Sequence, residues 1–293
     1  MRKVLPIIIL VLLLGLVGRL LTLGPATRGT ERLERQQALK IHFLDVGQGD
    51  CTLLQTPDKR NVLVDAGDED SADDVVRYLL RNQVERIDLL VITHPHTDHI
   101  GGLPRVLEQF GVSRVLDAGY PHPSQAYSDA LAIIESRNIA YRRTAEMRAP
   151  KVSKEVSFEV LWPPDGYSPS GESGLDNGSV VMRVEYGDIS LLLAGDIERE
   201  AEGKLLATRQ DFQSTILKVA RHGGQDGTSN EFLQVVRPEY AVISVGAENL
   251  LGHPARATLR RLNAVGAKTL RTAQRGTIVI TTDGRSVRVR PER

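Results

Sequence analysis

Residues 93–102, THPHTDHIGG, place three imidazoles and one carboxylate within six consecutive positions. They follow residues 87–92 (IDLLVI), a short run rich in branched apolar side chains that predicts a buried strand. The whole chain contains only seven histidines, so a solvated loop is a poor explanation for three of them together. Because open α/β sheets carry their chemistry at the carboxyl ends of their strands, we expect a functional site here.

The side chains of this stretch form a donor set typical of first-row divalent cations. Imidazole nitrogen and carboxylate oxygen both bind zinc and related ions. His94 and His96 lie two residues apart on an extended segment, so we expect them to point the same way. Asp98 and His99 follow the turn, and we expect them to face a second ion. The two glycines that end the stretch let the backbone pass close to the site.

The pattern H-x-H-x-D-H, after a strand and before two glycines, resembles the metallo-β-lactamase superfamily. The further motifs resemble the C-terminal hydrolase domain of ComEC-type competence proteins and its free-standing relatives. They occur in order at residues 43–51 (FLDVGQGDC), 62–67 (VLVDAG), 193–196 (LAGD), 217–224 (LKVARHGG) and 252–254 (GHP). The resemblance covers residues 39–291.

The amino-terminal sequence predicts export. Residues 1–3 (MRK) are followed by an apolar run at 4–17, and the span 4–23 is long enough to cross a bilayer of ~30 Å. We expect residues 1–24 to be a signal anchor, or a signal peptide if they are cleaved, and residues 25–38 to be a polar linker. The domain at 39–293 is then held at the outer side of the cell membrane by the helix, or secreted.

Composition limits the partners of the chain. Lys+Arg and Asp+Glu both total 37, so no overall positive field attracts a polyanion, and DNA would have to be bound by local charge. Cys51 is the single cysteine, which excludes an intramolecular disulfide and a cysteine-ligated zinc site. No protein partner is inferred.

After residue 39 the pattern alternates between strands and helices. Two halves, each β-rich and then αβ, predict a four-layer αβ/βα sandwich with the site between the ends of its sheets. Strands are expected at 41–46, 52–55, 61–64, 87–92, 114–117, 139–143, 151–153, 156–162, 179–186, 189–194, 215–220, 240–245, 268–272, 277–281 and 286–290. Helices are expected at 71–82, 103–110, 125–137, 197–208, 229–235 and 255–265, and a loop at 163–176.

Two further metal ligands are implied by the resemblance. Asp196 ends an apolar strand, where the superfamily has its bridging aspartate, although such a residue can also cap the following helix. His222 again ends a strand before glycine and resembles the last metal-binding histidine. The expected cofactors are two divalent ions, Zn²⁺ or Mn²⁺. Their expected ligands are His94, His96, Asp98, His99, Asp196 and His222.

The first metal lacks its usual third histidine. Most of the superfamily has one before the strand that precedes the Gly-Asp motif, but residues 175–181 read LDNGSVV. The amide oxygen of Asn177 is one candidate, a harder ligand that would favour manganese over zinc. His122 is the other candidate, although a histidine on a surface loop is the preferred interpretation.

Further residues are expected around the ions. The resemblance places Asp65 behind the histidine loop as a support for the ligands. Arg221 stands where relatives commonly have a second histidine, and we expect Arg221 and Lys218 to neutralise a phosphate. His253 is expected to contact the substrate or to protonate the leaving group, the alternative being a plain histidine at a helix start.

These observations predict a hydrolase. Two ions would lower the pKa of a shared water, and the hydroxide would attack phosphorus or a carbonyl carbon while Asp98 orients it. The resemblance implies a phosphodiesterase, with DNA as one substrate. The alternatives are an acyl hydrolase of the β-lactamase or lactonase type and a non-catalytic surface binding protein.

Overall fold

Two β-sheets form the centre of the part of the chain that the structure describes, residues 38–292 of a computed structural model. In spatial order, the first sheet contains β16 (Val287–Pro291), β15 (Ile278–Thr282), β1 (Leu39–Phe43), β2 (Thr52–Gln55), β3 (Asn61–Val64), β5 (Leu89–Ile92), β7 (Arg114–Asp117) and β8 (Ala140–Arg143). The second contains β14 (Lys268–Arg271), β13 (Tyr240–Ile243), β12 (Ile216–Lys218), β11 (Ile189–Leu193), β10 (Val181–Tyr186) and β9 (Ser157–Trp162). A small third sheet pairs β4 (Arg86–Ile87) with β6 (Gly111–Val112).

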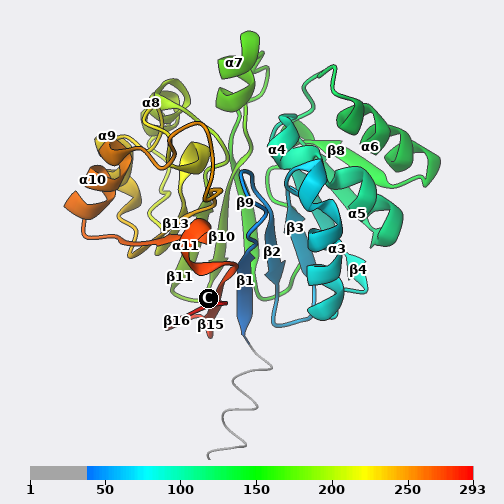
Figure 1. The fold of residues 1–293 in the computed structure, drawn as a ribbon, viewed down its shortest axis with the longest axis horizontal. Helices are drawn as coiled ribbons and strands as arrows, with labels where there is room; N and C mark the ends of the chain where they lie inside the picture. The colour runs from blue at the N-terminus through cyan, green and yellow to red at the C-terminus, as the bar shows by residue number, and fades with distance from the viewer. Residues whose placement is uncertain (1–37, 293) are drawn as a thin grey trace, which may run out of the picture. The chain divides into compact units, whose positions relative to one another are not determined.

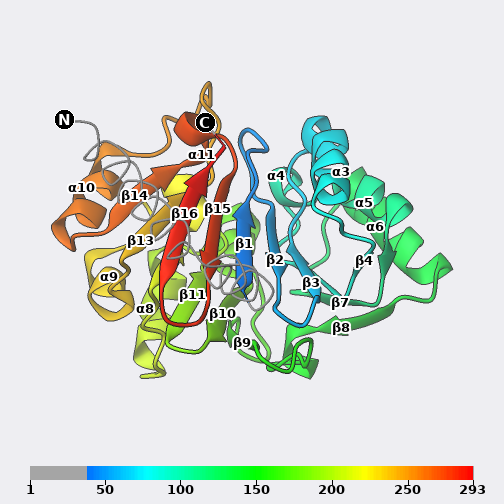
Figure 2. The same ribbon diagram turned by 90° about the horizontal axis from the view of Figure 1, so that it is seen from below.

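Helices cover the outer face of each large sheet, which gives four layers (Figure 1). Over the first sheet lie α3 (Ala72–Arg81), α5 (Leu103–Gln109) and α6 (Gln125–Ser136). Over the second lie α8 (Arg199–Ala207), α9 (Asn230–Val236) and α10 (Arg256–Ala264). Seen from below, β15 and β16 extend the first sheet beside β1 (Figure 2).

Successive side chains of the strands belong to different cores, because they point to opposite faces of the sheet. In β3, Val62 and Val64 face the core between the sheets, whereas Leu63 packs under α3 and α5. In β11, Leu191 faces the same central core and Leu192 faces the core under α8 to α10. Both faces are therefore buried, which explains the uninterrupted apolar runs in the sequence.

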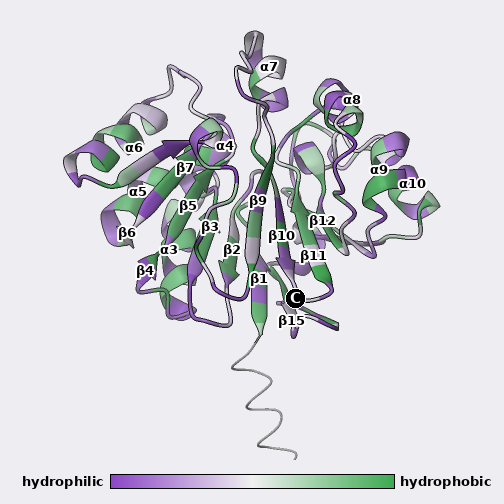
Figure 3. Ribbon diagram, turned by 180° about the vertical axis from the view of Figure 1, so that it is seen from behind, coloured by the Kyte–Doolittle hydropathy of each residue, from purple (hydrophilic) through white to green (hydrophobic). Residues whose placement is uncertain are grey.

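The hydropathy of the ribbon follows this arrangement (Figure 3), with hydrophobic residues along the inner strands of both sheets. The edge strand β8 is different: its arginines, Arg142 and Arg143, are exposed. Charged side chains on an edge strand discourage pairing with another chain. The order of elements and the four layers confirm the predicted four-layer αβ/βα sandwich.

Two local predictions are wrong. Residues 151–153 form no strand, and the second half of the expected loop at 163–176 belongs to α7 (Gly171–Asn177). Short elements also occur at η1 (Glu69–Ser71), α4 (Thr97–Ile100), η2 (Thr144–Glu146), η3 (Ala220–Gly223) and α11 (Thr272–Arg275).

The predicted leader at 1–24 and most of the linker lie outside the described residues. Among the helices of residues 38–292, none combines the length and the apolar character needed to cross a membrane.

Candidate metal centre

The candidate ligands come from segments far apart in sequence that end at the same side of the two sheets (Figure 1). The histidine stretch runs from the end of β5 through α4, Asp196 follows β11, and His222 lies in η3 shortly after β12. The parallel pairing of β11 with β12 brings the ends of these strands together. Local sequence and sheet topology therefore combine to gather the polar side chains at one place.

The glycines after the histidine stretch allow the close backbone approach that the sequence predicted. A Cβ added to Gly102 would lie 2.3 Å from the carbonyl oxygen of Ala66, and one added to Gly101 would lie 2.4 Å from the backbone nitrogen of Glu69. Any larger residue would push α4 away from the loop that carries Asp65.

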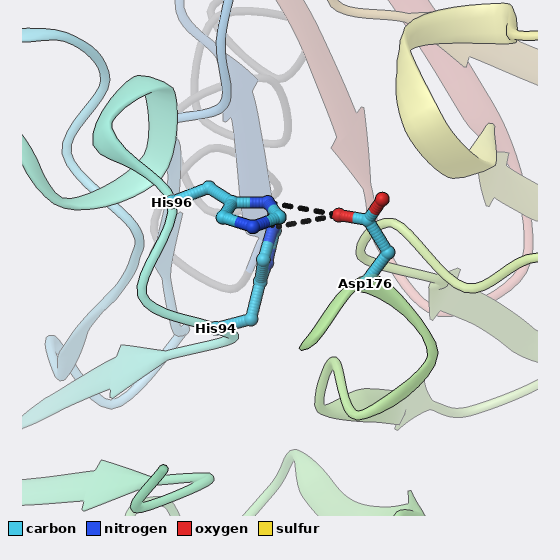
Figure 4. A group of neighbouring side chains, drawn as sticks. All are labelled: His94, His96 and Asp176. Carbon is cyan, nitrogen blue, oxygen red and sulfur yellow. Dashed lines mark hydrogen bonds and ion pairs between the residues drawn. The ribbon is translucent and has the colours of Figure 1, made fainter. Parts of the chain in front are cut away.

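One group of possible ligands, here called site one, consists of His94, His96 and Asp176 (Figure 4). His94 Nε2 lies 3.1 Å from His96 Nδ1. Asp176 Oδ1 lies 2.9 Å from His96 Nδ1 and 3.5 Å from His94 Nε2. Two imidazoles and a carboxylate thus direct one atom each toward a common point.

A second group, here called site two, consists of Asp98, His99 and His222. His222 Nε2 lies 3.0 Å from Asp98 Oδ2. Asp196 faces both histidines of this group, because its Oδ1 lies 3.5 Å from His99 Nε2 and its Oδ2 lies 3.5 Å from His222 Nε2. Asp196 also groups with His94 and His99, so it lies within reach of both sites.

Each of the four imidazoles has a partner on its outer nitrogen. His94 Nδ1 lies 3.1 Å from the Thr93 hydroxyl, and His222 Nδ1 lies 3.1 Å from the Ser244 carbonyl oxygen. His96 uses Nε2, 2.8 Å from Glu172. Such partners fix the ring orientation and leave the other nitrogen free to bind a metal.

Asp65 is the outer partner of His99, with 2.8 Å between its Oδ2 and His99 Nδ1. It also accepts hydrogen bonds from the Thr93 backbone nitrogen at 2.9 Å and from the Thr93 hydroxyl at 2.7 Å. The structure thus places Asp65 behind the histidine loop, where the resemblance put it.

The carboxylates give the centre a negative potential. At His99 burial opposes the charged imidazole, but Asp196 and Asp98 outweigh burial and raise its pKa well above the usual value. At His222 burial is outweighed by Asp196 and then by Asp50, which raises its pKa to about 9. Burial would also raise the pKa of Asp196, but His222 and His99 outweigh it and hold that pKa well below the usual range.

The centre passes a direct test for a bound cation. Within the described residues, two of its buried atoms lack a hydrogen-bond partner, His99 Nε2 and Asp196 Oδ1. Buried polar atoms are rarely left in this state, and a divalent ion between them would satisfy both. The residues of the two sites therefore fit a pair of divalent cations.

Comparison with known proteins agrees with this geometry. Residues 44–247 match the family model described as the metallo-beta-lactamase superfamily. The chain belongs to this superfamily. With its metal-ligand set, it is a metal-dependent hydrolase of the metallo-β-lactamase superfamily.

The similar proteins include competence proteins of the ComEC type, which confirms the resemblance seen in the sequence. ComE operon protein 3 of Bacillus subtilis is 28% identical over 82% of this chain and 32% of that protein. Competence protein ComA of Neisseria gonorrhoeae is 33% identical over 80% of this chain and 31% of that protein. This chain thus spans about a third of the length of these relatives.

A solved structure shows the same fold. CmlA, a diiron β-hydroxylase from Streptomyces venezuelae, superposes with a TM-score of 0.50 at 17% identity, covering 80% of this chain and 52% of that chain.

Asn177 does not hold the position predicted for it in this metallo-β-lactamase fold. Its side-chain oxygen accepts hydrogen bonds from the backbone nitrogens of Glu198 and Ala201, both at 3.1 Å, and its amide group donates to the Ser173 carbonyl oxygen at 2.8 Å. Both ends of the amide are thus occupied at the start of α8. The carboxylate of the preceding residue, Asp176, reaches site one instead.

Asp176 is the ligand candidate that sequence reasoning missed. The signal was present, because a carboxylate adjoins the position where the superfamily has its third histidine. Its orientation depends on α7, which the sequence did not predict. His122, the other candidate, approaches only the outer side of His96, with ring centroids 6.0 Å apart, and groups there with Glu172.

Lys218 also requires a correction. The residue is 1% exposed, and its ammonium forms an ion pair with Asp50. Burial opposes the Asp50 carboxylate, but Lys218 outweighs burial and lowers the pKa of Asp50 to about 2. Asp50 in turn lies 3.5 Å from His222 Nδ1, so the ion pair lies behind His222. Lys218 is therefore buried in this pair and does not point toward a substrate phosphate as predicted.

Arg221 and His253 lie at the edge of the centre. The Arg221 side chain is one-third exposed, and its Nε lies 3.2 Å from Asp176 Oδ2. The His253 ring lies 6.5 Å from the His222 ring, and burial followed by His222 and Arg221 lowers its pKa. A neutral imidazole suits a substrate contact better than full proton donation to a leaving group.

Proposed function

We propose that this domain hydrolyses phosphodiester bonds at a centre of two divalent ions. The observation that carries the proposal is the position of Asp196, which groups with His94 of site one and His99 of site two and whose Oδ2 lies 3.5 Å from His222 Nε2 of site two. Divalent ions at such a centre supply Lewis acidity, lower the pKa of water and clamp both oxygens of an in-line displacement.

The ligands of site one favour phosphate chemistry over acyl transfer. With Asp176 in place of a third histidine, site one offers two nitrogens and one oxygen. A harder donor set suits manganese better than zinc, and ions of that kind commonly bind substrate phosphates together with carboxylates. We therefore expect Mn²⁺ to support more activity than Zn²⁺.

Other residues of the chain assist the reaction. Asp98 is partly exposed, and its pKa is lowered because His99 and His222 outweigh the effect of burial. Its ionised carboxylate is suited to accept a hydrogen bond from the attacking water and to orient it. His253, beside His222, is suited to donate a hydrogen bond to the departing oxygen.

The name of one relative supports a nucleic-acid substrate, and the amino-terminal sequence supports an extracytoplasmic site of action. ComA of Neisseria gonorrhoeae is described as a competence protein, and DNA is a phosphodiester polymer. The apolar run at residues 4–17 supports export, with the domain at the outer side of the cell membrane or secreted.

Three substrates distinguish the proposal from its alternatives: bis-p-nitrophenyl phosphate, single-stranded DNA and nitrocefin, each with Mn²⁺ or Zn²⁺. We expect turnover of the two phosphodiesters, fastest with Mn²⁺, and loss of that turnover in His96→Ala, which lacks a ligand of site one. Hydrolysis of nitrocefin alone would favour an acyl hydrolase. Binding of DNA without turnover in any metal would favour a binding protein.

A further inference from the structure

Arg221 lies among three carboxylates at the outer side of site one. Its Nε is 3.2 Å from Asp176 Oδ2. Its Nη1 is 2.5 Å from Glu198 Oε1 and 3.7 Å from Asp226 Oδ2. The guanidinium group is therefore already engaged by the protein, and a substrate phosphate would have to compete with these carboxylates.

The two oxygens of Asp176 face different partners. Oδ1 faces the imidazoles of His94 and His96, and Oδ2 faces Arg221. Since a carboxylate that rotates freely loses orientation as a ligand, the contact on Oδ2 determines which oxygen is presented to site one. A planar guanidinium group with fixed donor directions is well suited to this task.

Glu198 anchors Arg221 from the opposite side. Its Oε2 accepts a hydrogen bond from Asn177 Nδ2 at 3.1 Å and another from the Ser173 hydroxyl. The side chain of Glu198 is mostly buried at the start of α8. Arg221 is thus held by a partner that does not itself contact the metal ligands.

The backbone of η3 directs Arg221 and His222 to different sites. Both residues adopt left-handed conformations, with φ of 50° and 51°. Two consecutive non-glycine residues in this region are uncommon, and such strain is retained where function requires it. This one turn therefore directs the His222 imidazole to site two and the Arg221 guanidinium group to Asp176 at site one.

We propose that Arg221 is a positioning residue that holds Asp176 as the third ligand of site one. The inference depends on the two-metal centre of the proposed function. It states that Asp176 binds the metal of site one well only while Arg221 holds its second oxygen. If Arg221 instead contacts a substrate phosphate directly, its replacement leaves metal binding unchanged.

Titration of the whole chain with Mn²⁺ alone, by calorimetry and electron paramagnetic resonance, separates these roles. The variants are Asp176→Asn, Arg221→Met, Arg221→Lys and the double variant. Arg183→Met is the matched control, because Arg183 also pairs with a carboxylate, Glu185, at 2.7 Å but lies on β10 among none of the candidate ligands. Circular dichroism checks that each variant is folded.

We expect the wild-type chain to bind two Mn²⁺ ions. Arg221→Met should weaken one of them by roughly 10- to 100-fold, the range typical for loss of a partner behind a metal ligand. Asp176→Asn should weaken the same ion, and the double variant should be no weaker than Asp176→Asn, because both changes disrupt one interaction. Arg221→Lys should recover part of the affinity, and Arg183→Met should bind as the wild type does.

Unchanged affinity for both ions in Arg221→Met, or additive losses in the double variant, would overturn the positioning role. A wild-type chain that binds two Mn²⁺ ions but hydrolyses no phosphodiester would refute the proposed function and leave this role intact. Fewer than two bound ions in the wild type would refute the two-metal centre and the positioning role together.

Discussion

Asp176 and Asn177 are neighbours in the sequence, but their side chains serve different parts of the molecule. Both are buried at the end of α7. Asp176 faces the histidines of site one, whereas Asn177 bonds to the first turn of α8. Adjacent helical residues point about 100° apart, so one turn of helix is enough to separate a ligand from a structural residue.

Asn177→Ala is expected to destabilise the fold without loss of a metal ion. The change removes the acceptor of two backbone N–H groups and the donor to Ser173. Leaving buried groups unpaired costs about 1–3 kcal/mol each, so we expect a clearly lower free energy of unfolding in urea. Loss of one Mn²⁺ with unchanged stability would instead restore Asn177 as a ligand.

For single residues, the sequence correctly predicted a place at the metal centre where that place depends on a local motif. His94, His96 and His99 lie in one short stretch, and Asp65 directly follows its own strand. Lys218 could not be assigned correctly, because it is paired with Asp50, a residue of the loop between β1 and β2 that is far away in the sequence. The sequence gives no distance between two such residues.

Among the elements, β1 and α3 meet through a buried histidine. His42 is 2% exposed, and its Nδ1 lies 2.9 Å from the Tyr78 hydroxyl of α3. Burial, with a smaller effect from Lys40, lowers the pKa of His42 from 6.5 to about 4. The folded state therefore favours the neutral imidazole at this contact.

The stability of the wild-type chain should depend on this group in mildly acid solution. Because the folded pKa lies below the unfolded one, the contribution of His42 is complete above pH 6.5 and is lost as the pH falls toward about 4. A shift of this size corresponds to about 3 kcal/mol. His42→Phe, which does not titrate, should lose correspondingly less stability over that range in urea unfolding.

Tyr78→Phe is the control for this comparison, because it keeps the buried imidazole and should keep the pH dependence. Equal pH dependence in the wild type and His42→Phe would show that His42 does not titrate in this way.

Element types were largely predictable, because most strands and helices bury strongly patterned faces. Residues 89–92 of the apolar run before the histidine stretch form β5, although Ile87 belongs to β4, and the stripe of α3 buries Val75, Val76 and Leu79. Residues 163–176 read as a loop from their proline, glycine and serine content, yet α7 forms there. Contacts of its last turn, between Asp176 and His96 and from the Trp162 ring nitrogen to the Asn177 carbonyl oxygen, compensate for a weak local preference.

For the domain as a whole, sheet topology brings the ligands together. β5 belongs to the first sheet and β11 and β12 to the second, and the segments after all three carry ligands of the same centre. The four-layer sandwich followed from the alternation of patterns along the chain. The convergence itself followed from the family resemblance, because periodicity alone does not determine which strand ends meet.

The central claim is that this convergence holds two cations on either side of Asp196. Crystals of the Mn²⁺-loaded chain, measured at the manganese absorption edge, test it most directly. We predict two anomalous peaks about 3.5–4 Å apart, one beside His94, His96 and Asp176 and the other beside Asp98, His99 and His222. A single peak, or peaks away from Asp196, would contradict the two-metal centre.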